Sequence, residues 1–247
     1  YGAAVESIDW ATSVIMNELH SLGLDENTIV IFTSDNGSLG NVHPPFGDRK
    51  ELIGGSNLPL RGAKGTTWEG GQRVPAIVRW KGKIEAGRVC DELLTAMDFY
   101  PTLANLCGAK VPQDRIIDGI DAQAVWFDAQ AKSQHEHFVY YRANGLEAIR
   151  DRQYKLHFGR GNQDVFELYD IAHDVSETVN VYDRYPEVVA SLTKAANNYR
   201  QTLGDDRTGS VGTQVRPIGR VENPRPLTEF DSRHPYVIAE YDLPDRG

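Results

Sequence analysis

The sequence predicts an α/β fold followed by a small antiparallel α+β unit, and three patterns carry this prediction. Residues 4–22 place apolar side chains at helical spacing, and residues 28–33 form a nearly continuous apolar run after a short connector. A helix, a short loop and a strand covered on both faces form the repeat of parallel α/β sheets. Residues 138–169 then hold four closely spaced strand-like runs, which favour an antiparallel sheet.

The first half of the chain contains the candidate α/β elements. The helix over residues 4–22 carries one apolar stripe and ends at Gly23, a common helix stop. The stripe consists of Val5, Ile8, Ile15, Leu19 and Leu22. A second strand is predicted over residues 76–80. Asp98 and Pro101 indicate the start of a helix that runs to Gly108, because Asp is a favoured N-cap and Pro fits the first turn.

The second half reads as a sheet, a helix and a tail. The four runs span residues 138–141, 147–150, 154–158 and 166–169, and the final helix is predicted over residues 186–203. Asp170, Asp174 and Glu177 read as capping and turn residues before that helix. We therefore predict three parts: an α/β part over residues 1–133, a small α+β subdomain over residues 134–204, and an irregular tail over residues 205–247.

Composition narrows the classes of function. The chain has 247 residues, of which 40% are hydrophobic and 25% charged, and its net charge is −9. These proportions are typical of globular proteins, and the negative charge argues against a nucleic-acid binder. No apolar run approaches the ~20 residues of a membrane span, and no signal peptide is visible in a chain that begins at Tyr1. Cys90 and Cys107 are compatible with a disulfide in an exported protein and with buried thiols.

An acid–amide pair follows the strand predicted over residues 28–33. Asp35 and Asn36 present a carboxylate and an amide oxygen side by side, and hard cations such as Ca²⁺ prefer oxygen ligands. Asp-Asn-Gly is also a hairpin signal. A hairpin should be followed at once by an alternating strand, and no such strand follows here. The pair is therefore a candidate metal site, with a simple turn as the alternative.

A glycine-flanked lysine returns after a long loop. Lys64 lies between Gly62 and Gly65, and glycines allow the backbone to approach a ligand closely. A lysine ammonium is a compact charge suited to an anion such as sulfate, although an exposed loop lysine is the ordinary alternative. His43 lies in the long loop from which it could reach a substrate. We expect ion pairs of Arg61, Glu69 and Arg73 to rigidify the turn and Trp68 to anchor it by packing.

Three segments in this region resemble the sulfatase family, in the family's order and spacing. They are Ser34-Asp35-Asn36-Gly37, the stretch from Leu60 to Gly71, and Arg73-Val74-Pro75. The resemblance is nearest to the group of arylsulfatase A and N-acetylgalactosamine-6-sulfatase, and it extends to about Leu203. It implies an alkaline-phosphatase-like α/β/α sandwich with a small C-terminal four-stranded sheet and helix.

The resemblance also implies an activity and a place for it. It implies hydrolysis of an aryl or carbohydrate sulfate ester, with Asp35 and Asn36 as ligands of Ca²⁺ and Lys64 as a catalytic, sulfate-binding residue. Members of this family use a formylglycine made from Cys or Ser, and a periplasmic, secreted or lysosomal location is implied. The oligomeric state and the identity of the sulfated substrate stay open.

The sequence departs from the family pattern upstream of these motifs. It contains no Cys/Ser-x-Pro-x-Arg segment, and neither Cys90 nor Cys107 lies in one. The family's early Asp-Asp pair and its upstream Lys and His residues have no match either. We therefore expect a truncated chain that is inactive alone. Two alternatives remain: a phosphodiesterase or phosphonate ester hydrolase of the same superfamily, and a noncatalytic binding protein that kept the fold. The upstream sequence would discriminate among them.

Overall fold

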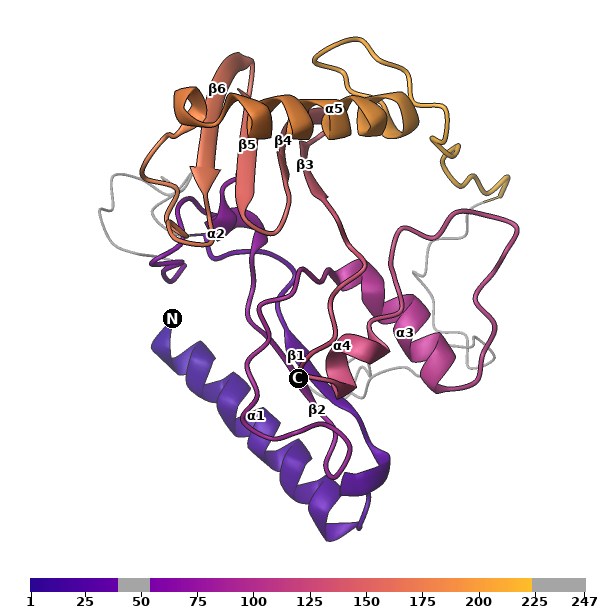
Figure 1. Cartoon of the computed structure of the whole chain (residues 1–247). Coiled ribbons are helices and arrows are strands. Elements are labelled where there is room, and N and C mark those ends of the chain that lie inside the picture. The colour runs from indigo at the N-terminus through magenta and orange to yellow at the C-terminus, as the bar shows by residue number, and fades with distance from the viewer. Residues whose placement is uncertain (40–53, 224–247) are drawn as a thin grey trace. The chain divides into compact units, whose positions relative to one another are not determined.

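A computed structural model describes residues 1–39 and 54–223 of the chain (Figure 1). The chain divides into two compact units, Tyr1–Val215 and Arg216–Gly247. Residues 216–223, the described part of the second unit, contain no helix or strand. All elements below belong to the first unit. The division into parts at residues 133 and 204 stays a prediction.

The first elements form as the periodicity predicts, but their pairing differs from the prediction. Helix α1 spans Gly2–Ser21, the short helical turn η1 spans Asp25–Asn27, strand β1 spans Val30–Thr33 and strand β2 spans Ala76–Arg79. The two strands pair antiparallel, with Val30 opposite Arg79.

The expectation of a strand covered on both faces is therefore wrong for the described residues. Phe32 of β1 is 40% exposed, Ile77 of β2 is 60% exposed, and α1 has no buried residue. The physical reason is that a paired strand lies at the edge of its neighbour, whereas a face is covered only by an element packed on it. Within the described segments β2 is the only strand paired with β1, and α1 buries none of its residues, so the faces of the two strands stay partly exposed.

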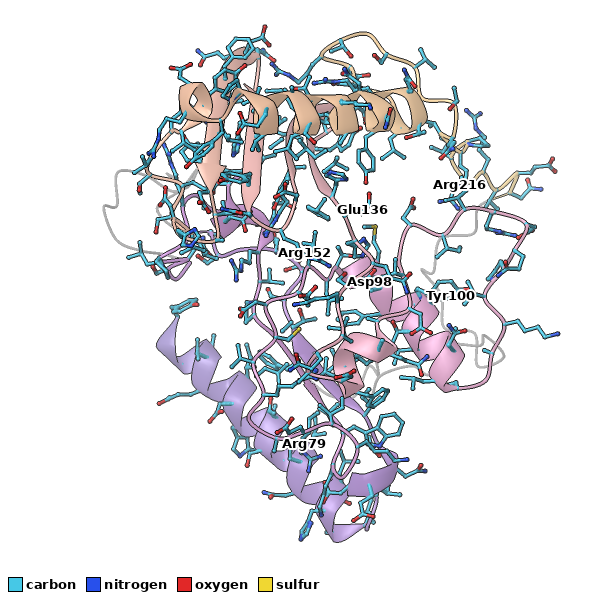
Figure 2. All side chains as sticks on the ribbon, in the orientation of Figure 1. Arg79, Asp98, Tyr100, Glu136, Arg152 and Arg216 are labelled. Carbon is cyan, nitrogen blue, oxygen red and sulfur yellow. The ribbon has the colours of Figure 1, made fainter. Side chains whose placement is uncertain are left out.

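A buried carboxylate ties the end of α1 to β2. Asp25 is 6% exposed, and its carboxylate lies 2.9 Å from both His20 Nδ1 and Arg79 Nη2, with Lys81 Nζ at 3.5 Å. The hydrogen bonds from His20 and Arg79 lower the pKa of Asp25 to about 2. Figure 2 labels Arg79 at this junction. The contact fixes the start of the β1–β2 pair, which leads into the candidate site.

Three short helical segments lie between the two sheets in sequence. They are η2 (Ala96–Asp98), α3 (Phe99–Leu106) and α4 (Gln123–Phe127). Asp98, labelled in Figure 2, does not cap α3 as predicted. Its buried carboxylate instead accepts hydrogen bonds from Thr95 N at 2.7 Å, Ile120 N at 2.9 Å and His135 Nε2 at 2.8 Å. The side chain therefore closes a capping box one turn earlier, with Thr95 as the cap.

The small antiparallel sheet and its helix confirm the prediction for the second half. Strands β3 (Phe138–Arg142), β4 (Gly145–Arg150), β5 (Tyr154–Arg160) and β6 (Gln163–Asp170) pair in sequence order. The turn η3 (Tyr182–Arg184) precedes helix α5 (Pro186–Leu203). Helix α5 runs along one face of the sheet (Figure 1), and its buried side chains pack on that face. The core consists of Leu146, Ile149, Leu156, Leu168, Val181, Leu192 and Ala196.

Candidate functional site

The segment after β1 lies directly against the loop that carries Lys64. Lys64 N donates a hydrogen bond to Ser38 O at 2.9 Å, and Ser38 is two residues after Asn36. Gly37 N donates to Gly71 O at 3.1 Å. Asn57 reinforces the contact, because its amide accepts from Ser38 N at 2.7 Å and donates to Gly62 O at 3.0 Å. The structure thus brings the segment of the predicted acid–amide pair together with the predicted lysine loop.

Glycine is required where the two segments meet. A Cβ on Gly37 would lie 1.7 Å from Gly70 O, and a Cβ on Gly71 would lie 2.2 Å from Thr66 O. Both atoms they would strike belong to the backbone, so neither can move aside as a flexible side chain would. Gly62 and Gly65 have φ values of 82° and 83°, in the left-handed region that favours glycine. The glycines around Lys64 therefore permit both the tight turn and the close approach.

Asp35 and Asn36 present oxygen atoms that fit a hard cation. Asp35 is exposed and Asn36 half-buried, and the Asn36 amide donates to Asp35 Oδ1. Ser34 Oγ donates to Asn36 O at 3.0 Å, which closes the turn after β1. Asp35 Oδ2 and Asn36 Oδ1 accept no hydrogen bond from a described residue. Ca²⁺ takes 6–8 oxygens, so further ligands would have to come from elsewhere.

The described residues contain no group of three or more His, Cys, Asp or Glu side chains that could hold a metal ion. The Lys64 side chain is exposed, and its ammonium forms no ion pair or hydrogen bond with residues 1–39 or 54–223. His43 lies outside the described residues. The metal role of Asp35 and Asn36 and the sulfate-binding roles of Lys64 and His43 therefore stay predictions.

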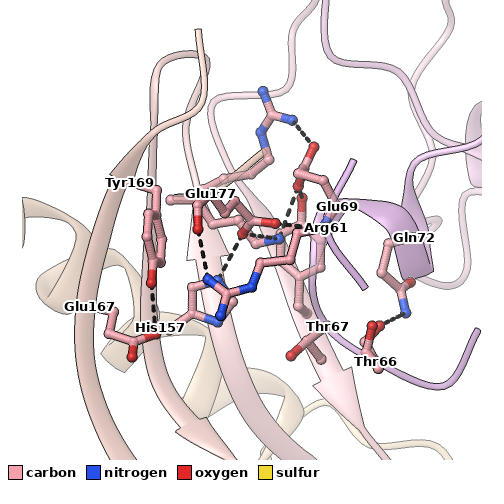
Figure 3. Close-up of polar contacts among 12 residues, drawn as sticks. Arg61, Thr66, Thr67, Glu69, Gln72, His157, Glu167, Tyr169 and Glu177 are labelled. Atoms are coloured by element: carbon pink, nitrogen blue, oxygen red, sulfur yellow. Dashed lines mark hydrogen bonds and ion pairs between the residues drawn. The ribbon is translucent and has the colours of Figure 1, made fainter. Parts of the chain in front are cut away.

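The loop that carries Lys64 continues into a buried ionic contact with the small sheet. Helix α2 (Glu69–Gln72) follows the loop, and Glu69 is 1% exposed. Its carboxylate accepts hydrogen bonds from one residue on each of three strands (Figure 3). These are Tyr140 Oη of β3 at 2.7 Å, Arg150 Nη1 of β4 at 3.2 Å and Lys155 Nζ of β5 at 3.0 Å. The predicted ion pairing is confirmed for Glu69.

The predicted ion pairing is not found for Arg61 or Arg73 within the described residues. Arg61 forms no carboxylate ion pair within the described segments; its guanidinium instead stacks 3.9 Å from the Trp68 ring centroid. Arg73 forms no ion pair there either. Arg160 of β5 covers the same indole at 4.2 Å, and Tyr169 meets it edge-on at 5.7 Å between ring centroids. Trp68 is 8% exposed, which confirms that it anchors the loop by packing.

Glu177 closes a turn as predicted, because its N–H donates to Asp174 O at 3.0 Å, and its side chain has a further role. It is fully buried, and its carboxylate lies 3.0 Å from Lys155 Nζ, 3.0 Å from His157 Nε2 and 2.7 Å from Glu69 N. Asp174 also behaves as predicted, because its carboxylate accepts from Thr178 N and Val179 N and so stabilises a turn. The Glu177 carboxylate in addition joins β5 to the loop that carries Lys64.

Glu69, Lys155, His157 and Glu177 form one buried cluster. Burial and nearby cations determine which of its side chains are protonated. Burial by itself raises the pKa of Glu69, but the positive charges of Lys155 and Arg150 and the Tyr140 hydrogen bond lower it below its ordinary value. Burial lowers the pKa of His157, and Lys155 lowers it further, although Glu177 opposes the change. At neutral pH the cluster therefore holds charged Glu69 and neutral His157, with Nε2 donating to Glu177.

Sequence reasoning missed Lys155 and His157 because their pattern is that of an exposed strand face. In β5 they alternate with Leu156 and Phe158, which face α5 and its core. Polar residues at alternate strand positions are typical of a solvated face. Here the loop from Arg61 to Glu69 covers that face instead. The partners that make their burial possible, Glu69 and Glu177, lie far from β5 in the sequence. No local sequence pattern could therefore have found Lys155 and His157.

Comparisons with known proteins find similarity to sulfatases. Residues 1–109 match the family model described as sulfatase, and residues 63–202 match the model described as N-sulphoglucosamine sulphohydrolase, C-terminal. The steryl-sulfatase of Homo sapiens is 43% identical over 150 residues, covering 61% of this chain and 25% of its own length. Arylsulfatase D of Homo sapiens is 34% identical over 238 residues, covering 82% and 40%.

A solved structure supports the same assignment. The PsFucS1 sulfatase from Pseudoalteromonas sp. superposes with a TM-score of 0.68 at 30% identity, covering 78% of this chain and 40% of that chain. This similarity confirms the predicted alkaline-phosphatase-like α/β fold class with its small antiparallel sheet. The chain spans between 25% and 40% of the length of these three relatives. None of the helices in the described segments is both long and apolar enough to cross a membrane.

Proposed function

Because the chain belongs to the sulfatase family, we propose that residues 1–247 supply part of the active site of an enzyme that hydrolyses an aryl or carbohydrate sulfate ester. The products are the alcohol and inorganic sulfate. The chain spans less than half the length of its relatives, so the activity is proposed for a longer protein that includes these residues. The single observation that carries the proposal is the backbone contact between Ser38 and Lys64.

Lys64 is the residue of this chain that we assign to catalysis. Its ammonium is exposed and unpaired within the described segments, so it is available to a substrate anion. Charge on the nonbridging oxygens must be stabilised as the ester bond breaks, and preorganised donors supply this stabilisation best. Because Lys64 N is fixed to Ser38 O, the ammonium starts from a rigid backbone position. We propose that it contacts a nonbridging sulfate oxygen, with His43 as a further substrate contact.

Asp35 and Asn36 are the residues that would hold a divalent cation, which we propose to be Ca²⁺. When bound, such an ion would neutralise negative charge on sulfate oxygens. The two side chains supply only part of its ligands. The chain contains no Cys/Ser-x-Pro-x-Arg segment, so we assign the formylglycine nucleophile to sequence outside residues 1–247. A periplasmic, secreted or lysosomal location is proposed with the activity.

The test is a pair of Lys64 variants in the longer protein. Lys64→Ala should lower kcat by about 10²–10³, the range measured when one preorganised donor is removed, while bound metal and fold are kept. Lys64→Arg should recover little activity, since a planar fork replaces a compact charge. Lys132→Ala is the matched control, because Lys132 is an exposed lysine whose ion pair among the described residues is with Glu92.

Three results would count against the proposal. Near-normal turnover in both Lys64 variants would make Lys64 an ordinary loop residue. Faster hydrolysis of a phosphodiester than of any sulfate ester would favour the phosphodiesterase alternative. Absence of turnover in the wild-type longer protein, with an intact nucleophile segment, would favour a noncatalytic role. Residues 1–247 alone should show no turnover with an aryl sulfate, because nucleophilic catalysis needs a nucleophile that this chain lacks.

A further inference from the structure

Glu177 combines complete burial with an uncommon backbone conformation. It is 0% exposed, and its φ is 52°, in the left-handed region that residues other than glycine rarely adopt. Such residues persist only where the surrounding structure holds them, and they concentrate at functional sites. Glu177 lies in the connection between β6 and α5, where a glycine would relieve the strain. Because a glycine would fit this backbone better, the presence of glutamate points to a role of its carboxylate.

The described groups that contact the Glu177 carboxylate are all hydrogen-bond donors (Figure 3). Lys155 Nζ and His157 Nε2 both lie 3.0 Å from Oε1, and Glu69 N donates to Oε2 at 2.7 Å. The backbone oxygen of Glu177 accepts from Arg61 Nη1 at 2.7 Å. One residue thus binds β5 on one side and two loop residues, Arg61 and Glu69, on the other.

Those two loop residues are the ends of the segment that carries Lys64. Gly70 N donates to Arg61 O at 2.7 Å, so the segment forms a closed loop. Arg61 and Glu69 form the base of this loop, and both are hydrogen-bonded to Glu177. At its far side the loop touches the segment after β1 through Lys64 N and Ser38 O. A shift at the base would strain or break the contact between Lys64 N and Ser38 O, and so change where Lys64 lies relative to Asp35 and Asn36.

We propose that Glu177 is a positioning residue that acts through the Arg61–Glu69 loop to place the Lys64 ammonium. The inference rests on the proposed function for its catalytic consequence. A misplacement of about 1 Å can cost about 10² in rate, so a residue that never touches substrate can still control turnover. The small sheet then acts as a rigid support that fixes the position of the loop carrying Lys64.

The first experiment measures the loop in the 247-residue chain and does not depend on catalysis. In Glu177→Gln, one acceptor oxygen replaces two, so either Glu69 N or the two donors on Oε1, Lys155 and His157, face an amide NH₂ that also donates. Amide exchange of Lys64 and Gly70 should accelerate by about 10–100-fold, which corresponds to the loss of one buried charged hydrogen bond. The amides of Leu156 and Leu168, in the core of the sheet, should keep their rates.

A matched control removes another buried carboxylate that contacts the same sheet. Asp205 is 1% exposed and holds Arg200 Nε at 2.8 Å and Leu146 N at 3.0 Å, with no contact to the loop. Asp205→Asn should lower the melting temperature without accelerating exchange at Lys64. If Glu177→Gln does not fold, Arg61→Met tests the same connection from the loop. It removes the hydrogen bond from Arg61 Nη1 to Glu177 O, so a smaller acceleration at Lys64 and Gly70 is expected.

The second experiment measures turnover in the longer protein. Glu177→Gln should lower kcat at least tenfold with little change in KM, and the variant that also carries Lys64→Ala should be no slower than Lys64→Ala alone. A residue that acts through Lys64 gives this non-additive result, whereas an independent structural role gives multiplied losses.

Unchanged exchange at Lys64 and Gly70 in a folded Glu177→Gln chain would overturn the inference. Normal kcat in the Glu177→Gln enzyme, or multiplied losses in the double variant, would overturn it as well. An inactive wild-type longer protein would instead count against the proposed function, and the exchange rates in the 247-residue chain would still decide whether Glu177 positions the loop.

Discussion

Replacing Lys155 with methionine tests how much the buried cluster contributes to folding. Lys155 is fully buried, and its ammonium lies 3.0 Å from Glu69 Oε1 and 3.0 Å from Glu177 Oε1. Methionine fills similar space without charge. Removing one partner of a buried ion pair costs about 3–5 kcal/mol, because the other partner stays buried without compensation.

The remaining contacts place the expected cost at the lower end of that range. Glu69 keeps Arg150 at 3.2 Å and the Tyr140 hydroxyl at 2.7 Å, whereas Glu177 keeps only neutral donors, Glu69 N and His157. We expect Lys155→Met to lower the free energy of unfolding by about 3 kcal/mol at pH 8. With an m-value of about 3 kcal/mol/M, the urea midpoint falls by about 1 M.

The loss of unfolding free energy caused by Lys155→Met should become smaller as the pH falls. In the wild type, the pKa of His157 is lowered from 6.5 by burial and by Lys155. The unfolded chain therefore binds its proton first, and wild-type stability falls as the pH drops through 6.5. Without Lys155, a protonated His157 is the only cation within ion-pair distance of the Glu177 carboxylate among the described residues, so the folded-state pKa of His157 rises. The variant then gains stability relative to the wild type between pH 8 and 5.5.

In the wild type, protonation of Glu69 does not disturb this window. The folded-state pKa of Glu69 lies below 4.5 because Lys155 and Arg150 outweigh the effect of burial. Its contribution to stability is present above pH 4.5 and is lost only as the pH falls further, through that lowered pKa.

The assay is urea unfolding of the 247-residue chain at several pH values, followed by circular dichroism. Lys132→Met is the control: Lys132 is 71% exposed in its pair with Glu92, and exposed pairs contribute about 0–1 kcal/mol. A cost of less than about 1 kcal/mol for Lys155→Met at pH 8 would show that the cluster is not a stabilising contact. A cost that stays constant from pH 8 to 5.5 would refute the role assigned to His157.

Three further predictions address the site and the core. In the longer protein, Asp35→Ala should lose bound metal and activity together. Unchanged metal content by elemental analysis would show that Asp35 and Asn36 form only a turn. Gly37→Ala should separate the strand end from the lysine loop, since its Cβ would lie 1.7 Å from Gly70 O; unchanged amide exchange at Lys64 would contradict this. Leu192→Ala should cost about 2–5 kcal/mol because Leu192 is 1% exposed, whereas Phe166→Ala, at a residue 65% exposed, should cost much less in the same urea titration.

The local elements were predictable because their signals are short-range. Helix α5 begins at Pro186 and ends before Gly204, as the sequence indicates, since Pro suits a first turn and Gly suits a helix stop. The alternating runs between residues 138 and 169 likewise form a meander, because close spacing leaves little chain for any other connection. The candidate roles of Asp35, Asn36 and Lys64 also came from local motifs, and their segments do meet in the structure.

By itself the sequence identified the family and the main helices and strands, and it proposed Asp35, Asn36 and Lys64 as site residues. The tertiary structure decided the antiparallel pairing of β1 with β2, the exposure of their faces and the burial of Lys155, His157 and Glu177. Periodicity reports which side chains share a face of a strand, but it does not report what covers that face. In β5 one face meets the apolar side of α5 and the other meets the loop of Lys64. Only residues distant in the chain, Glu69 and Glu177, make a charged interior favourable, because burial of Lys155 requires their carboxylates within hydrogen-bond distance.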